Sequence, residues 1–250
     1  MTVVAALNDV HGNLPALEAV LADPAFARAD MVVVGGDVAA GPLPAAVLDR
    51  LQALDLPVRW VQGNADREVV DAFDRGDTDA SAHPDDVAAR ADAFTAGRIT
   101  PAHRDLLASF EELVRVDGTL YCHGSPRSDE EMITALTPPE RLGPMLAGVD
   151  ERLVVCGHTH HQFDLRARGR RVVNAGSVGM PYEGSAGAYW LLVADGEPEP
   201  QRTTYDIDAA AAVIRASGFP DAEDVVRESM VEPVAADEVA RFFEDRATSG

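Results

Sequence analysis

The segment LVVCGHTHH, residues 153–161, joins a strand-like apolar run to three of the chain's seven histidines, and this pattern indicates the fold. Residues 153–156 have the length and composition of a buried strand. A glycine ends the run, and His158, His160 and His161 follow within four positions. In open α/β sheets, ligands bind beyond the carboxyl ends of the strands. The segment therefore predicts an α/β protein with a functional site at this strand end.

Four further apolar runs end in the same way, in polar side chains that are able to bind a metal ion. The runs are residues 3–7, 31–34, 58–61 and 120–122. The side chains that follow them are, in order, Asp9 and His11, Asp37, Asn64 and Asp66, and His123. Each feature alone is a common cap or turn, but five of them at five strand ends would require five coincidences. We therefore interpret them as parts of one site.

The order of helices and strands predicts two β-sheets. Helical spacing over residues 14–22 and 43–54 separates the first three strands, and such alternation is typical of a largely parallel sheet. Short, closely spaced strands in the second half indicate a second, more antiparallel sheet. The remaining strands are expected at residues 113–116, 162–166, 171–174, 188–193 and 202–205. Helices are expected near the C-terminus at residues 207–217, 221–229 and 235–245.

Residues 1–250 are expected to form a single domain, because no repeat or linker interrupts them and their number allows an ample core. The middle of the chain is polar and lacks strand-like runs, and helices are expected near 84–96 and 101–110. We interpret residues 71–110 as a helical insertion, which either lies over the site or is a plain surface extension. Residues 206–250 form an expected helical extension, which covers a sheet face or contributes to a dimer contact; monomer and homodimer both stay open.

The composition limits the partners of this protein. Its 21 basic residues, all arginine, are outnumbered by 42 acidic residues, so the net charge is −21. Such a chain repels duplex nucleic acid and anionic membranes unless a local cation reverses the field. No apolar run approaches the roughly 18 residues of a membrane helix, and the N-terminal segment lacks the basic start of a signal peptide. We expect a cytoplasmic protein with two buried, reduced cysteines.

The polar side chains at the strand ends have the chemistry of a metal site. They offer two carboxylates, one amide and four imidazoles, those of Asp9, Asp37, Asn64, His11, His123, His158 and His160. Mixed oxygen and nitrogen donors suit Mn²⁺, which we favour, and also iron, Zn²⁺, Ni²⁺ or Co²⁺. Seven donors exceed the need of one ion and fit two ions about 3.5–4 Å apart that share one carboxylate. Because alternate side chains of extended backbone point the same way, Asp9 and His11 are expected to bind one ion together.

Charge counting indicates the substrate. Two divalent ions bring four positive charges, of which Asp9, Asp37 and a bridging hydroxide would cancel three. The site would therefore be locally cationic within a strongly acidic protein. That is the positive focus that a phosphate ester requires.

The ordered blocks resemble the calcineurin-like metallophosphoesterases, whose pattern reads D-x-H, G-D, G-N-H-[DE], H and G-H-x-H. This sequence has Asp9-Val10-His11, Gly36-Asp37, Gly63-Asn64-Ala65-Asp66, His123 and Gly157-His158-Thr159-His160. The match covers residues 3–195. The stretch NAGSVGMP (174–181), followed by AGAYWLLVADG, is similar to the small bacterial phosphodiesterase branch, which includes hydrolases of diadenosine tetraphosphate. The resemblance implies an α/β fold, a four-layer α-β-β-α sandwich of two mixed sheets flanked by helices.

The resemblance also implies roles for the seven ligands. It assigns Asp9, His11 and His160 to one ion, assigns Asn64, His123 and His158 to the other, and makes Asp37 the bridge. Two positions depart from the family: Asn8 replaces the usual serine, and Ala65 stands where many relatives have a histidine that stabilises the transition state or protonates the leaving oxygen. General acid catalysis typically contributes about 10²–10⁴-fold to the rate, so substrates with poor leaving groups are expected to be hydrolysed slowly.

Four further residues have more than one interpretation each. His161 either supplies the acid that Ala65 cannot, or binds phosphate, or is a surface residue at the start of the next strand. Asp66 is expected to orient Asn64 or a histidine ligand. Asn13 and Arg67 are our candidate substrate contacts, although Asn13 is equally suited to cap the helix over 14–22, and Arg67 to be solvated at a helix start.

The sequence therefore predicts a dinuclear-metal-dependent phosphoesterase that hydrolyses phosphodiester or nucleotide-type substrates by attack of a metal-bridging hydroxide. Asp37, Asn64 and His123, assisted by Asp66 and His161, are the expected catalytic set. One alternative is a phosphomonoesterase or protein phosphatase. Another is a non-catalytic interaction module on the same fold, although relatives of that kind typically lose several ligands, and all seven are present here.

Overall fold

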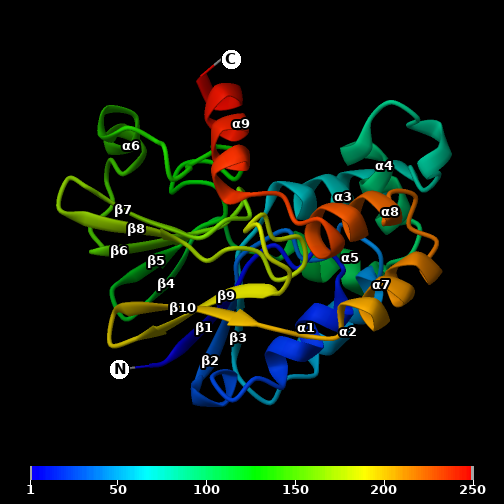
Figure 1. The fold of residues 1–250 in the computed structure, drawn as a ribbon, viewed down its shortest axis with the longest axis horizontal. Coiled ribbons are helices and arrows are strands. Elements are labelled where there is room, and N and C mark those ends of the chain that lie inside the picture. The colour runs from blue at the N-terminus through cyan, green and yellow to red at the C-terminus, as the bar shows by residue number, and fades with distance from the viewer. Residues whose placement is uncertain (1, 249–250) are drawn as a thin grey trace.

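The computed structural model describes residues 2–248, which form two five-stranded β-sheets with helices on their outer faces (Figure 1). The strands are β1 (Val4–Leu7), β2 (Met31–Val34), β3 (Val58–Trp60), β4 (Val114–Val116), β5 (Thr119–Tyr121), β6 (Leu153–Cys156), β7 (Phe163–Ala167), β8 (Arg170–Asn174), β9 (Ala188–Ala194) and β10 (Glu197–Thr203). One sheet has the order β10-β9-β1-β2-β3 and the other the order β4-β5-β6-β8-β7.

Both sheets are mixed to the same degree. In the first, β1, β2 and β3 run parallel, as the alternation with helices predicted, and β9 and β10 add antiparallel. In the second, β5, β6 and β8 run parallel, with β4 and β7 antiparallel at the edges. The prediction that the last two strands join a more antiparallel second sheet is therefore wrong. Six of the seven residues of β9 are buried, so its pattern could not reveal which sheet it enters.

The last strand, β10, lies earlier in the chain than predicted. It spans Glu197–Thr203 instead of 202–205 and forms a hairpin with β9 across the two-residue turn Asp195-Gly196. Both turn residues have positive φ, 54° and 75°, as the tightest hairpins require. The sequence did not indicate this strand, because it contains two prolines, and proline has no N–H group to donate to a neighbouring strand. Proline is tolerated in an edge strand, and β10 lies at the edge of its sheet.

Alternation along the strands produces the layers. Val4 and Ala6 of β1 face the core between the two sheets, whereas Ala5 and Leu7 face a second core beneath helices. Strand β6 divides in the same way between the central core and a third core under α6. The predicted four-layer α-β-β-α sandwich is confirmed.

The helices are α1 (Leu14–Leu21), α2 (Pro44–Gln52), α3 (Asn64–Arg75), α4 (Val87–Ala96), α5 (Pro101–Ala108), α6 (Pro139–Met145), α7 (Ile207–Ala216), α8 (Ala222–Val226) and α9 (Ala236–Thr248). Helices α1, α2, α3 and α5 cover the first sheet, and α6 covers the second. Helix α6 was not predicted, because Gly143 and Pro144 give it poor helical propensity. The π-helical turn Arg227–Val231 follows α8 directly.

The two predicted helical segments meet on one side of the molecule. Phe94 of α4 packs edge-on against Phe219, with ring centroids 5.1 Å apart, in a cluster that includes Ile214 and Val226. The two segments thus form walls beside the strand ends (Figure 1). That the whole chain is one domain stays a prediction. Among residues 2–248, no helix combines the length and apolar character that a membrane span needs.

Candidate metal centre

The seven side chains with metal-ligand chemistry lie in the loops after β1, β2, β3, β5 and β6. Five of them have a left-handed backbone: φ is 53° at Asp9, 45° at His11, 51° at Asp37, 66° at His158 and 57° at His160. Aspartate and histidine tolerate this region better than most residues, but each instance still costs roughly 1–3 kcal/mol. The expectation that extended backbone aligns Asp9 with His11 is therefore wrong, because tight left-handed turns bring them together instead.

Four of these residues form a first group of ligand atoms, all within 4.8 Å of one another. The group is Asp9, His11, Asp37 and His160. The Nε2 atom of His160 lies 3.3 Å from Oδ1 of Asp9, and the Nε2 atom of His11 lies 3.7 Å from Oδ2 of Asp37. All but His11 are buried, so the carboxylates cannot be solvated as surface groups would be.

A second group shares Asp37 with the first. It contains His123 and His158, again with ligand atoms within 4.8 Å, and Nε2 of His123 lies 3.3 Å from Oδ2 of Asp37. Asn64, at the start of α3, lines one cavity with Asp37 and another with His158. The geometry thus gives two adjacent groups that meet at one carboxylate.

Backbone carbonyls orient three of the four imidazoles. The Nδ1 atoms of these rings contact Ala40 O for His11 (3.0 Å), Gly35 O for His123 (2.9 Å) and Met180 O for His160 (2.9 Å). Since a carbonyl only accepts, each Nδ1 carries a proton, and Nε2 is the ring atom that is directed at the site and can coordinate once it is unprotonated. His11 and His160 point these two atoms at each other, 3.2 Å apart, an arrangement that a cation between them would stabilise.

Unpartnered buried atoms show that the side chains fit a metal. In the described part of the chain, nine buried side-chain atoms lack a hydrogen bond, and four of them cluster at the site: Asp9 Oδ1, Asn64 Oδ1, His123 Nε2 and His158 Nε2. Buried polar atoms are normally paired, and an unpaired one costs about 1–3 kcal/mol. All four belong to predicted ligands, and all four are atoms able to coordinate. Metal ions would satisfy the whole set at once.

The charges in the site are strongly coupled. Burial alone would raise the pKa of Asp37, but His123, His11 and His158 outweigh it and hold that pKa well below its usual range. Burial tends to lower the pKa of His123, yet Asp37 and Asp9 raise it to about 10. Burial and the neighbouring His123 lower the pKa of His158 to about 4. Metal ions would therefore displace a proton at His123 and find His158 already neutral.

Glycines let the loops approach closely. A Cβ on Gly63 would lie 2.2 Å from Oδ1 of Asp37, and one on Gly157 would lie 2.5 Å from Oδ2 of Asp9. Neither residue has positive φ, so the reason is space and not conformation. The glycines beside the predicted ligands are therefore required by the packing of the carboxylates.

Residues 174–181 hold the ligand loops in place through hydrogen bonds to their backbone. Ser177 donates from Oγ to the carbonyl of Asp9 (2.7 Å), and Asn174 donates to the carbonyl of Gly157 (2.6 Å). Tyr182, just beyond this loop, stacks on the ring of His160 with centroids 5.2 Å apart. These contacts hold the first and last ligand loops, which are about 150 residues apart in sequence, against each other.

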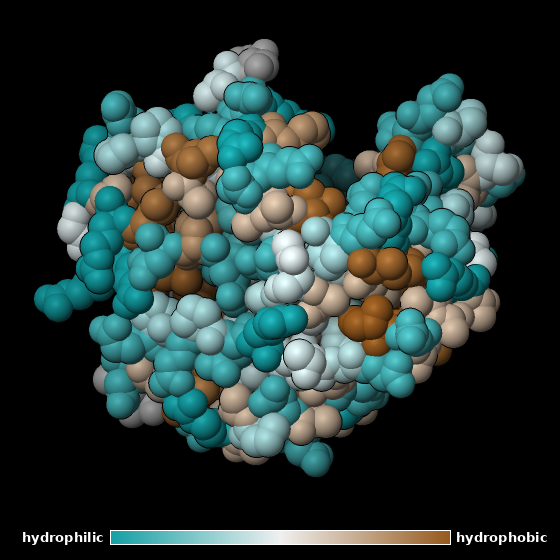
Figure 2. Space-filling model, in the orientation of Figure 1, coloured by the Kyte–Doolittle hydropathy of each residue, from teal (hydrophilic) through white to brown (hydrophobic). Residues whose placement is uncertain are grey.

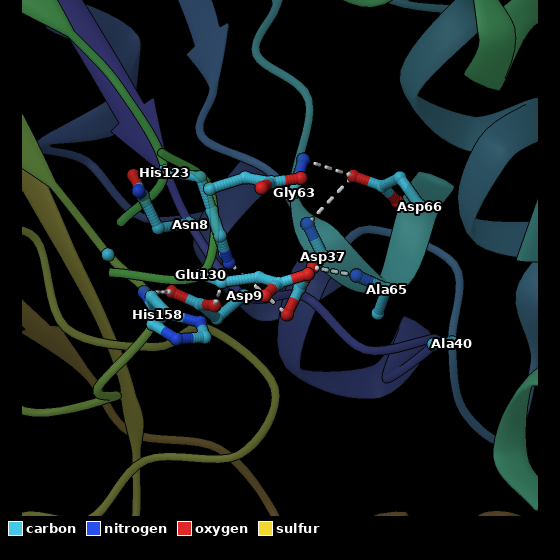
Figure 3. Close-up of polar contacts among 12 residues, drawn as sticks. Asn8, Asp9, Asp37, Ala40, Gly63, Ala65, Asp66, His123, Glu130 and His158 are labelled. Atoms are coloured by element: carbon cyan, nitrogen blue, oxygen red, sulfur yellow. Dashed lines mark hydrogen bonds and ion pairs between the residues drawn. The ribbon is translucent and has the colours of Figure 1, made fainter. Parts of the chain in front are cut away.

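Asp66 clamps the bridging loop. Its carboxylate accepts N–H bonds from Asp37 (2.8 Å), Val38 (2.9 Å) and Gly63 (3.1 Å), as Figure 3 shows for Asp37 and Gly63. We expected it to orient Asn64 or a histidine, but these bonds instead position the backbone of Asp37. Burial and then Asp37 raise the pKa of Asp66 to about 7 despite these donors.

The Asp66→Asn variant should lose metal affinity about 10–100-fold, the usual effect of removing such a support. An amide keeps one acceptor oxygen and turns a donor toward an N–H group, so at least one backbone donor is left unpaired, which costs about 1–3 kcal/mol of stability. Calorimetric titration with Mn²⁺ and urea unfolding measure the two effects. Asp71→Asn, at an exposed position of the same helix, is the control; equal behaviour of the two variants would contradict the clamp.

Three predicted residues lie in surroundings that do not favour their assigned roles. Asn13 is fully buried, caps α1 through Ala16 N–H (3.2 Å) and donates to Gly179 O (2.8 Å), so the structure shows the cap. Arg67 is not simply solvated, because it pairs with Asp129 (3.0 Å) and Glu130 (2.7 Å). The side-chain amide of Asn13 is thus engaged in these two bonds, and the charge of Arg67 is offset by two carboxylates.

His161 is neither a surface residue nor a proton donor to substrate in this geometry. It is 1% exposed, its Nε2 accepts from Ala135 N–H (3.4 Å), and its Nδ1 therefore donates to Thr159 O (2.9 Å). Burial lowers the pKa of His161, which favours this neutral form. Both nitrogens are used, so the imidazole cannot replace the histidine missing at Ala65. The sequence did not indicate that His161 is engaged in this way, because the residue directly follows the predicted ligand His160.

Arg246 was missed by sequence reasoning. It lies on α9 and lines two cavities of about 600 and 700 Å³ that both reach Asn64. Glu244, two residues earlier, anchors α9 by accepting bonds from Thr134 (2.8 Å), Thr137 (3.0 Å) and Arg141 (2.5 Å). No motif marks Arg246, because only folding brings the last helix to the strand ends.

Comparisons with known proteins agree with this geometry. The sequence model of the calcineurin-like phosphoesterase superfamily domain matches residues 1–197. A metallophosphoesterase from Sphaerobacter thermophilus is similar at 26% identity and a TM-score of 0.72, over 90% of this chain and 96% of its own. A hypothetical protein from Pyrococcus horikoshii OT3, 19% identical, shares the fold with a TM-score of 0.77 over 91% and 97%. A search of curated proteins found no match. Since the family model spans most of the sequence, the chain belongs to the calcineurin-like phosphoesterase superfamily.

Proposed function

We propose that the protein is a dinuclear-metal-dependent phosphodiesterase. Membership of the family indicates a metal-dependent hydrolase of small phosphate esters. The observation that carries the finer proposal is the pair of ligand groups that share Asp37, together with four ligand atoms that have no hydrogen bond among the described residues. One group suits one ion and the second, completed by Asn64, suits another, with Mn²⁺ as the favoured metal.

The residues of the chain would supply orientation and charge. Divalent ions held by these residues would supply Lewis acidity, which makes water more acidic and offsets the charge of the phosphoryl oxygens. The carbonyl-bonded imidazoles direct their Nε2 atoms inward, and Asp66 keeps Asp37 in place. Both ring nitrogens of His161 are engaged in hydrogen bonds, so His161 does not take the place of the histidine that is missing at Ala65. Substrates with good leaving groups, which need no general acid, are therefore favoured.

Two chromogenic substrates test this proposal. With Mn²⁺ present, bis(4-nitrophenyl) phosphate should be hydrolysed with a higher kcat/KM than 4-nitrophenyl phosphate. The reverse order would favour the phosphomonoesterase or protein phosphatase alternative. Absence of hydrolysis of any ester by metal-loaded protein would favour the non-catalytic interaction module. We further propose that the protein acts on a small phosphate ester in the cytoplasm, as a monomer or a homodimer.

Arg246→Ala should raise the KM for the diester about tenfold and change kcat little. Arg246 is exposed, has no ion pair among the described residues and lines both cavities beside Asn64, so it is placed to hold a phosphoryl oxygen. A charge-assisted bond of this kind is worth about 1.5 kcal/mol or more, which is about tenfold. Steady-state kinetics measure the effect. Arg241→Ala, an exposed arginine of α9 that pairs with Asp237, is the control, and an equal KM in both variants would exclude the contact.

A further inference from the structure

The cavity beside Asp37 is acidic, and we refer to it as the acidic cleft. It has a volume of about 600 Å³ and reaches His11, Asp37 and Asn64. Figure 2 shows the surface hollowed between α9 and the segment of α4, with hydrophilic residues along the rim. Besides Asp37, seven carboxylates line the acidic cleft: Glu68, Asp85, Asp86, Asp92, Asp221, Asp224 and Glu228. Arg246 is the one arginine among the described residues that line it.

Three of these carboxylates are neutralised from outside the cleft. Asp221 pairs with Arg90 (2.6 Å), and Arg227 contacts both Asp224 (2.6 Å) and Glu228 (2.7 Å). The other four have no ion-pair partner within residues 2–248, namely Glu68, Asp85, Asp86 and Asp92. The four carboxylates without an ion pair therefore lie on α3, just before α4 and within α4.

Asp92 shows most directly that a partner is missing. It is only 8% exposed, and no hydrogen bond or ion pair to it occurs in the described part of the chain. Burial and then the nearby charge of Glu68 raise the pKa of Asp92 to about 8. A buried carboxyl group without a partner is unfavourable, and a cation in the cleft would stabilise its ionised form.

A metal ion does not fit this part of the cleft. In residues 2–248, the groups of three or more acidic, histidine or cysteine ligands within 4.8 Å are the two at Asp37, and neither includes Glu68 or Asp92. The same cleft is also lined by Met180, Tyr182 and Phe219. A cavity whose walls combine carboxylates with aromatic and apolar side chains suits an organic ammonium ion.

The adjoining cavity does not offer a polyphosphate site. Arg127 and Arg141 line it together with Arg246, but Arg127 is paired with Glu131 and Arg141 with Glu244. A chain of phosphates that extended from the metal centre would therefore meet carboxylates on one side and neutralised arginines on the other. Dinucleoside polyphosphates fit these charges poorly.

We propose that the substrate is a phosphodiester of an amino alcohol, with its phosphoryl group at the metal centre near Arg246 and its ammonium group in the acidic cleft beside Glu68 and Asp92. This inference rests on the proposed function. It adds a substrate class that the ligand set cannot specify, since the metal centre binds only the phosphoryl group common to all phosphate esters. Choline and ethanolamine diesters have this chemistry.

Two diesters that differ in one charge test the proposal. Choline 4-nitrophenyl phosphate carries a quaternary nitrogen, and 3,3-dimethylbutyl 4-nitrophenyl phosphate carries carbon in its place. In both, the oxygen of hydroxide bonds to phosphorus, the bond from phosphorus to the nitrophenyl oxygen breaks, and 4-nitrophenolate leaves with the bonding electrons. We expect a kcat/KM at least about tenfold higher for the choline diester, because a cation near two carboxylates gains about that much at effective dielectric constants of 20 or more.

Variants locate the effect. Glu68→Gln and Asp92→Asn should each lower the preference for the choline diester severalfold, whereas Asp208→Asn, at an exposed position of α7, should retain it. Equal hydrolysis of the two diesters by the wild type would overturn the inference and leave the proposed function intact. Hydrolysis of neither would overturn the proposed function, and the inference with it. A preference that survives in both cleft variants would also overturn the assignment.

The origin of the diester can be distinguished with unactivated substrates. Glycerophosphocholine presents the headgroup as a free solute, and lysophosphatidylcholine micelles present it on a lipid surface. Hydrolysis of the first supports a soluble substrate, and hydrolysis of the second alone supports a lipid headgroup. If neither reacts while bis(4-nitrophenyl) phosphate does, the substrate class is wrong.

Discussion

Asp37→Ala should lower kcat/KM for bis(4-nitrophenyl) phosphate at least about 10³-fold and reduce the metal content of the protein. Asp37 is the one residue common to both ligand groups, and its Oδ2 lies 3.3 Å from His123 and 3.7 Å from His11. Without it, neither of the two proposed ions would keep its full set of donors. The loss of several kcal/mol of charge stabilisation corresponds to about three orders of magnitude in rate. Kinetics with saturating Mn²⁺ and metal analysis by inductively coupled plasma spectrometry measure the two effects.

A second variant separates metal loss from misfolding. Asp37 also accepts the N–H of Ala65 (2.9 Å), so its removal weakens the fold locally. Asn64 is different, because its Oδ1 has no hydrogen bond among the described residues. Asn64→Ala should therefore leave the stability of metal-free protein nearly unchanged and still reduce metal binding and activity. Asp55→Ala, at an exposed position, is the control for both variants. If the Asp37→Ala protein hydrolyses bis(4-nitrophenyl) phosphate with the kcat/KM of the wild type, the dinuclear proposal is wrong.

Removal of metal should lower the melting temperature as well as the activity. The metal-free site leaves four buried ligand atoms unpaired and five residues in left-handed backbone, so metal ions bind the folded state selectively. Metal at a hundred times its Kd stabilises a protein by about 2.7 kcal/mol. For a chain of this length that corresponds to roughly 5–10 °C. Differential scanning calorimetry with and without chelator, followed by re-addition of Mn²⁺, measures the shift.

The Asp37→Ala protein is the control for this experiment. Because its ligand groups lack their shared carboxylate, addition of Mn²⁺ should move its melting temperature much less than that of the wild type. A chelator that changes neither the melting temperature nor the activity of the wild type would contradict a metal centre at these residues. Re-addition of Mg²⁺ provides a second comparison, since imidazole donors favour Mn²⁺ over Mg²⁺.

Local sequence was sufficient for the central part of the fold. Apolar runs of four residues predicted β1, β2 and β6 within one residue, because a strand buried on both faces needs no other pattern. Local patterns failed where the information was not local. Strand β9 is equally apolar whichever sheet it joins, and β10 is concealed by prolines that only an edge position permits.

The identity of the candidate ligands also came from the sequence, through the residue types that follow each strand. The family resemblance implied how they divide into two groups, which local spacing alone does not give. His158 and His160 are two residues apart, yet they belong to different ligand groups, because left-handed turns separate their directions. His161 shows the opposite error: it adjoins a ligand in sequence, but its ring is buried against Thr159 and Ala135.

The sequence by itself determined which metal-binding side chains follow the strands, since side-chain type and spacing at strand ends are local properties. Only the tertiary structure decided which groups face one another across long sequence separations. It brought Arg246 of the last helix to the cleft, placed Asp92 of α4 without a partner beside it, and turned Asp66 toward the backbone of Asp37. The physical reason is that burial, charge pairing and cavity shape depend on packing between distant segments, which no local pattern encodes.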